Sequence, residues 1–124
     1  MIGGITYIIA YCYTFGEGVE KDERRGAFFS HKSALQGDVS GQTLWADYCD
    51  SGYGTKQEAF EYYMKAADQD NVWATTKVGE YLLKGTAGRT DYTQAKRYLT
   101  KAASQGSKEA QDLLSLYGSI LNYY

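Results

Sequence analysis

The segment Lys101-Ala102-Ala103-Ser104-Gln105-Gly106 has two counterparts in this chain, Lys65-Ala66-Ala67-Asp68-Gln69-Asp70 and Lys32-Ser33-Ala34-Leu35-Gln36-Gly37. The copies are offset by 33 and 36 residues. An aromatic residue precedes each segment at the same distance, and earlier glycines recur with the same two offsets; these positions are Phe29, Tyr62 and Tyr98, and Gly16, Gly52 and Gly85. Matches at so many fixed positions indicate an internal repeat of one structural unit.

Each unit reads as two helices joined by a turn that contains glycine. The first helix has a large apolar residue followed by a very small one, as in Ile9-Ala10, Trp45-Ala46 and Val78-Gly79. Small residues let helix backbones approach closely, and glycine after a helix supplies its left-handed end. One helical pair cannot cover its own apolar face, so the units are expected to stack. The predicted core of the first helices is Ile5, Ile9 and Tyr13; Trp45 and Cys49; and Ala74, Val78 and Leu82.

These residues resemble the Sel-one-like repeat (SLR) family, which is related to tetratricopeptide repeats. The resemblance rests on Gly16-Glu17-Gly18-Val19, Gly52-Tyr53-Gly54 and the Lys-Ala-Ala segments, and the second unit lacks three residues before Thr55. It implies an all-α fold, a right-handed α/α superhelix of about seven helices. The expected boundaries are one solenoid domain over 1–124, with repeats at about 3–38, 39–71 and 72–107 and a terminal helix, 108–124, as a cap.

Composition excludes several classes of function. The chain has 124 residues, no proline, 14 glycines and 13 tyrosines, and its 13 basic against 15 acidic residues give a net charge of -2. Nucleic-acid binding needs a basic surface, so no nucleic-acid partner is expected. The uncharged stretch 1–16 is too polar and too short for a membrane span, and no basic residue precedes Lys21 as a signal peptide would require. We interpret it as a buried first helix, with a cleaved precursor as the alternative.

Candidate catalytic groups do not converge in the sequence. His31 is the only histidine and lies among Phe28, Phe29 and Lys32, so a half-exposed helical residue is expected. Cys12 and Cys49 are interpreted as buried apolar residues of a cytoplasmic protein, although one disulfide, and export, remain alternatives. No Cys-x-x-Cys or His-x-x-x-His motif occurs. No enzyme activity, cofactor or metal is therefore predicted.

Both ends of the chain are apolar. The first helix carries Ile2, Ile5, Ile8 and Ile9, and the last segment carries Leu116, Ile120, Leu121 and Tyr124. Two interpretations stay open: these residues bury against neighbouring helices, or one end packs on another chain as a homodimer or partner interface.

A binding surface is expected on the first helices, because in tetratricopeptide-like solenoids these helices line the concave face, as the resemblance implies. Helical spacing places ten residues there, which we call the first-helix stripe: Tyr7, Tyr11, Thr43, Asp47, Asp50, Trp73, Thr76, Glu80, Leu83 and Asp112. The stripe is aromatic at its start and acidic in its middle. Such a groove suits a protein with a basic surface, whereas the alternative is an ordinary solvated helix face.

The leading hypothesis is a non-catalytic protein-binding module, in its most concrete form a stoichiometric inhibitor or immunity protein that blocks a basic toxin or enzyme. The alternative is an adaptor or signalling scaffold that binds weakly and reversibly. An enzyme resting on His31 or the cysteines is the third hypothesis.

Overall fold

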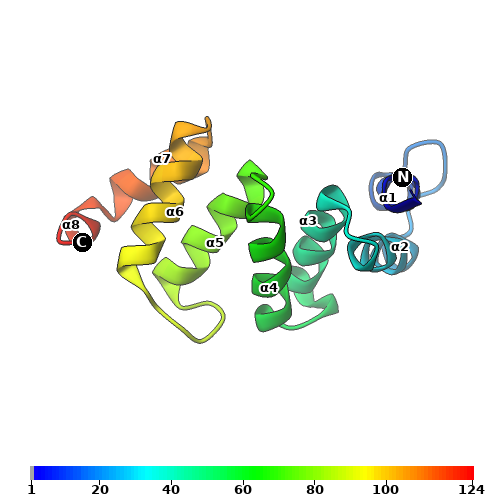
Figure 1. The fold of residues 1–124 in the computed structure, drawn as a ribbon. Coiled ribbons are helices and arrows are strands. Elements are labelled where there is room, and N and C mark those ends of the chain that lie inside the picture. The colour runs from blue at the N-terminus through cyan, green and yellow to red at the C-terminus, as the bar shows by residue number, and fades with distance from the viewer. Residues whose placement is uncertain (1) are drawn as a thin grey trace. The chain divides into compact units, whose positions relative to one another are not determined.

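A computed structural model describes residues 2–124 (Figure 1), and this part of the chain contains helices and no strand. The helices are α1 (Ile2–Phe15), α2 (Glu23–Leu35), α3 (Val39–Tyr48), α4 (Lys56–Ala67), α5 (Val72–Lys84), α6 (Tyr92–Ser104), α7 (Lys108–Leu116) and α8 (Gly118–Leu121), with a π-helical turn, Cys49–Tyr53, after α3. The predicted all-α fold of helical repeats is confirmed. None of the described helices is long and apolar enough to cross a membrane.

The contacts divide the chain into two compact units, one ending at Lys65 and the other spanning Ala66–Tyr124. The boundary falls near the end of α4. Each unit is described by itself, and the assignment of residues 1–124 to a single domain stays a prediction.

Helix starts follow from side chains that accept hydrogen bonds from exposed backbone amides. Asp22, Asp38, Asn71, Asp91 and Ser107 each precede a helix and accept from the amide three residues later. Such caps satisfy donors that have no partner inside the helix, each with about 1 kcal/mol of stabilisation. The sequence therefore fixes the starts of five helices locally.

Residues with positive φ mark the turns. Gly16, Gly52 and Gly85 have φ of 75°, 116° and 69°, which confirms that the repeated glycines form the turns within each unit. At the ends of the second helices, Gly37 and Gly106 adopt the same left-handed region, while Asp70 occupies that place after α4 with φ of 64°. Asp70 is the only non-glycine residue among those described with positive φ.

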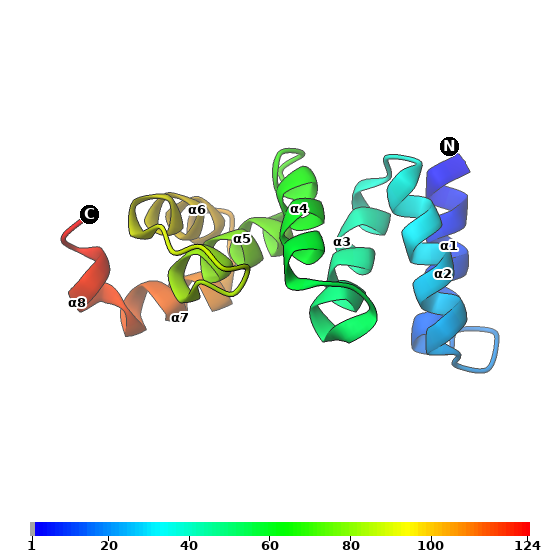
Figure 2. The same ribbon diagram turned by 90° about the horizontal axis from the view of Figure 1, so that it is seen from below.

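In the first unit, α2 packs against both α1 and α3, and Figure 2 shows α1 and α2 side by side. Several side-chain contacts join these helices. The Ser33 hydroxyl donates to the Gly3 carbonyl at 2.7 Å, the Tyr13 ring stacks on Phe29 with centroids 5.9 Å apart, and the Thr14 and Tyr48 hydroxyls are 2.7 Å apart. The last of these connects the first repeat directly to the second.

The predicted core of the first helix is wrong at two positions. Ile5 and Ile9 are 61% and 39% exposed, whereas Gly3, Thr6 and Ala10 are buried. The reason is the close approach of α2 and of the turn that follows it, since Ser33 of α2 donates to the Gly3 carbonyl and a Cβ on Gly3 would lie 3.0 Å from the Asp38 Cβ in that turn. Small residues therefore face α2, and the isoleucines lie on other sides of the helix.

In the second unit, α5 packs against α6 at Gly79, where an added Cβ would meet the Leu99 side chain at 2.7 Å. The predicted terminal helix over 108–124 is also wrong, because α7 ends at Leu116 and the short α8 follows. Glycine has low helix propensity, and Gly118 stands at this break. The change of direction brings α8 into contact with α6 and buries Leu121.

Candidate functional site

The stripe residues of α1 are aromatic and form a ladder along the helix. Tyr7 and Tyr11 have ring centroids 6.1 Å apart, and Tyr11 and Phe15 have centroids 4.7 Å apart. Tyr7 is half-buried and Tyr11 is exposed. Partial burial, and then the neighbouring Tyr11 and Asp38, raise the pKa of Tyr7. The ladder can offer apolar rings with polar hydroxyl ends to a partner.

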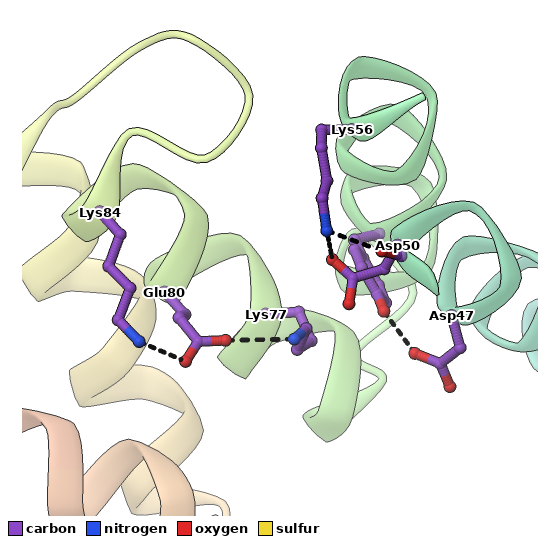
Figure 3. A network of polar contacts seen from close by, with 7 residues as sticks. Asp47, Asp50, Lys56, Lys77, Glu80 and Lys84 are labelled. Atoms are coloured by element: carbon purple, nitrogen blue, oxygen red, sulfur yellow. Dashed lines mark hydrogen bonds and ion pairs between the residues drawn. The ribbon is translucent and has the colours of Figure 1, made fainter. Parts of the chain in front are cut away.

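The stripe residues of the second repeat are held by contacts within the first unit. The Thr43 hydroxyl donates to the Val39 carbonyl at 2.9 Å. Asp47 accepts a hydrogen bond from the hydroxyl of Tyr63, a buried residue of α4. Lys56 Nζ lies 3.0 Å from an Asp50 carboxylate oxygen and 2.6 Å from the Asp50 carbonyl (Figure 3). Both carboxylates are therefore already engaged.

Glu80 of α5 lies between two lysines of its own helix. Its carboxylate oxygens are 3.1 Å from Lys77 Nζ and 3.2 Å from Lys84 Nζ (Figure 3). Burial works against the charged form of Glu80, but the hydrogen bonds and positive charges of Lys77 and Lys84 prevail and lower its pKa. Lys77 also lies over the Trp73 ring, 5.4 Å from its centroid. Glu80 thus stays ionised, with its charge compensated.

Two stripe residues do not face solvent, contrary to the prediction. Thr76 is 2% exposed, and its hydroxyl hydrogen-bonds to the Val72 carbonyl and to the Ser107 hydroxyl that caps α7. Leu83 is also buried. Since α5 packs against both α6 and α7, more of its surface is buried than helical spacing alone predicted. Trp73 and Asp112 remain exposed in the second unit.

His31, Cys12 and Cys49, which were considered for catalysis, have surroundings typical of structural residues. The His31 ring is half-exposed, as predicted, and stacks on Trp45 at 4.2 Å. Burial, and then the Glu58 carboxylate, raise the pKa of the Cys49 thiol to about 12, so the reactive thiolate is scarce there at neutral pH. Cys12 and Cys49 are both free thiols. Within residues 2–124, no three His, Cys, Asp or Glu side chains are grouped so that they could hold a metal ion.

Two surface hollows were not predicted. The larger, of about 840 Å³, lies in the second unit along the outer face of α6, and its lining includes Tyr98, Tyr124 and three cationic residues, Lys96, Arg97 and Lys101. The smaller, of about 270 Å³, lies in the first unit and is lined by Arg24, Ala27, Phe28, His31, Trp45 and Tyr53. The sequence did show basic residues gathered on the second helices, but the walls of a hollow depend on tertiary packing.

Similar structures and relatives are known. A Sel1 repeat protein from Oxalobacter formigenes superposes with a TM-score of 0.82 at 28% identity, covering 93% of this chain and 49% of that one. A protective antigen with an SLR fold, present in uropathogenic Escherichia coli strains, gives a TM-score of 0.86 at 30% identity, covering 96% of this chain and 27% of that one. Rat protein sel-1 homolog 2 is 35% identical over 71 residues, 55% of this chain and 10% of that protein.

The chain therefore spans half or less of the length of each of these proteins. Proteins with such repeats generally mediate protein–protein interaction. The Sel1 repeat model itself matches residues 6–38, 40–71 and 74–107, in line with the helical pairs and glycine turns described above. With most of its length accounted for by three such repeats, the chain belongs to the Sel1 repeat family.

Proposed function

We propose that this chain is a non-catalytic docking module that binds another polypeptide stoichiometrically through its first helices. The observation that carries the proposal is an exposed aromatic residue on a first helix of each unit, Tyr11 in the first unit and Trp73 in the second, each 40% exposed. Aromatic side chains of this kind supply most of the binding energy when a partner covers them. The general role of Sel1 repeats in protein–protein interaction supports the same assignment.

The narrower form of the proposal is an inhibitor or immunity protein that blocks a basic toxin or enzyme. It requires the carboxylates of Asp47, Asp50 and Glu80 to attract cationic residues of the partner. In the free protein, Asp47 accepts from Tyr63, and lysines pair with Asp50 and Glu80. A basic partner therefore has to displace Lys56, Lys77 and Lys84, which reduces the net electrostatic gain.

This compensation favours the second candidate, an adaptor that assembles other proteins and binds them reversibly. With Asp50 and Glu80 paired with lysines and Asp47 hydrogen-bonded to Tyr63, the stripe relies on Tyr11 and Trp73 as anchors rather than on a strong acidic field. Affinity separates the two candidates, since an inhibitor is expected to bind at picomolar to low nanomolar dissociation constants and an adaptor at about micromolar ones.

The experiment starts with affinity capture from the source cell, followed by calorimetric titration of the captured protein. The variant Asp47→Asn/Asp50→Asn/Glu80→Gln is compared with Glu17→Gln/Glu20→Gln/Glu61→Gln, which changes the net charge equally at exposed positions outside the stripe. The proposal expects weaker binding for the first variant only. Equal affinities for both variants and the wild type would remove the stripe carboxylates as a binding site, and unchanged affinity of Tyr11→Ala/Trp73→Ala would remove the aromatic anchors.

A further inference from the structure

The outer face of α1 is an apolar surface that nothing in the first unit covers. Ile2, Ile5, Ile8 and Phe15 are each between 58% and 74% exposed, and Ile9 is 39% exposed. We call these five residues the α1 face. No residue of α1 is charged. These five side chains offer on the order of 500 Å² of apolar surface, near the upper end of what a monomer ordinarily exposes in one patch.

The repeats indicate what kind of element fits this face. The offset of 36 residues makes Ile5 and Ile9 equivalent to Gly41 and Trp45 of α3. Both α3 residues pack on α2, the second helix of the preceding repeat. A Cβ on Gly41 would lie 2.9 Å from the Ser33 carbonyl carbon, and the Trp45 ring stacks on His31 at 4.2 Å. The equivalent residue in α7, Ala110, is likewise fully buried, and α7 packs against α6. The part of the α1 face that Ile5 and Ile9 form is thus equivalent to a helix-packing surface.

A helix placed as closely as α2 lies to α3 does not fit on α1. The close approach depends on Gly41 in α3, and α7 has Ala110 at the equivalent position, whereas α1 has the branched side chain of Ile5 there. The backbone of the covering helix must therefore lie farther away. Its side chains would interdigitate with the isoleucines, as in bundles and coiled coils.

The absence of charge on α1 favours a second copy of this chain as the occupant. A two-fold interface brings the same patch of both copies together, so that any charged residue near its centre would face its own counterpart. A helix that carries only apolar and neutral side chains avoids this repulsion. We propose that two copies of this chain associate through their α1 faces, with α1 of one protomer packed against α1 of its partner.

The first test is the mass of the full chain in solution, measured by sedimentation velocity and light scattering. The wild type is expected to dimerise at concentrations up to about 100 µM, since the shared patch is somewhat smaller than a standard interface side of about 800 Å². The variant Ile5→Glu/Ile8→Glu is expected to be a monomer with unchanged circular dichroism. Leu116→Glu, which places a glutamate at a 73% exposed site on α7, serves as the control and should leave the dimer intact.

A monomeric wild type across that range overturns the proposal, as does a dimer that persists in Ile5→Glu/Ile8→Glu or is lost in Leu116→Glu. The second test identifies the contacting helices directly. In the Cys12→Ser background, Ile5→Cys is expected to form an interchain disulfide on oxidation, whereas Leu35→Cys, at an exposed site on α2, should not. If both variants cross-link equally, the association is non-specific and the α1 pairing is wrong. Binding of another protein through the first-helix stripe is tested separately and does not depend on this result.

Discussion

The approach of α2 to α3 makes a sharp prediction for Gly41. A Cβ added there would lie 2.5 Å from the Ser33 Cβ and 2.9 Å from the Ser33 carbonyl carbon. The latter atom belongs to the backbone of α2, so it cannot rotate away as a side-chain terminus does. Gly41→Ala must therefore push the two helices apart.

The expected magnitude combines three effects. Alanine has a higher helix propensity than glycine by up to about 1 kcal/mol, which favours the variant. Overpacking costs about 1–3 kcal/mol. Displacement of Ser33 also weakens its hydrogen bond to the Gly3 carbonyl, which contributes about 1 kcal/mol. The net expectation is that the free energy of unfolding falls by about 2 kcal/mol.

Gly4→Ala is the matched control, because Gly4 and Gly41 are both the third residue of their helix. The nearest atom to an added Cβ on Gly4 is an Asp38 carboxylate oxygen at 3.8 Å, an ordinary contact. This variant should be neutral or more stable by up to about 1 kcal/mol. Urea unfolding followed by circular dichroism measures both. If Gly41→Ala is as stable as Gly4→Ala, the close packing of α2 on α3 is refuted.

Three further predictions concern polar contacts. Tyr48→Phe removes the hydrogen bond to Thr14 and should lower the free energy of unfolding by about 1 kcal/mol, whereas Tyr53→Phe at an exposed site should have no effect in the same urea titration. The lowered pKa of Glu80 means that its ion pairs stabilise the fold above the ordinary carboxyl pKa of 4.5 and lose this effect as the pH falls through the folded value. The difference between wild type and Glu80→Gln should therefore be about 1 kcal/mol at neutral pH and shrink steadily below pH 4.5, and a difference independent of pH would contradict it. The raised pKa of Cys49 predicts that a thiol reagent at pH 8 modifies Cys12 first and reaches Cys49 only on unfolding, which mass spectrometry of the labelled chain can check.

The sequence predicted the fold well because its determinants are local and repeated. Glycines at fixed offsets supply the left-handed turns, and the small residues Gly26, Gly41 and Gly79 lie where neighbouring helices approach most closely. A capping side chain before each of five helices is likewise readable from neighbouring residues. None of these features requires knowledge of distant contacts.

The predictions for individual faces were less accurate, because helical spacing fixes which residues share a face but not how far a neighbouring helix covers it. Helical spacing and the register of the repeats predicted that Ile5 and Ile9 lie in the core. The close approach of α2 instead selects Gly3, Thr6 and Ala10 for burial. In α5 the opposite error occurs, because residues predicted to be exposed are buried. Packing on two other helices buries Thr76 and Leu83, which simple spacing placed in the solvent-exposed stripe.

The acidic character of the stripe shows why formal charge is a poor guide to a binding surface. Lys77, Glu80 and Lys84 are three and four residues apart, so their pairing follows from helix geometry and could have been inferred from the sequence. The pairing of Lys56 with Asp50 could not, since it depends on the π-helical turn that follows α3. Nor could the hydrogen bond from Tyr63 to Asp47, because it joins side chains of two different helices, α4 and α3. Under the proposed function, a partner that binds at these carboxylates meets charges that are already compensated. Its selectivity is then expected to come from contacts with the exposed aromatic side chains and from hydrogen-bond donors that replace Lys56, Lys77 and Lys84.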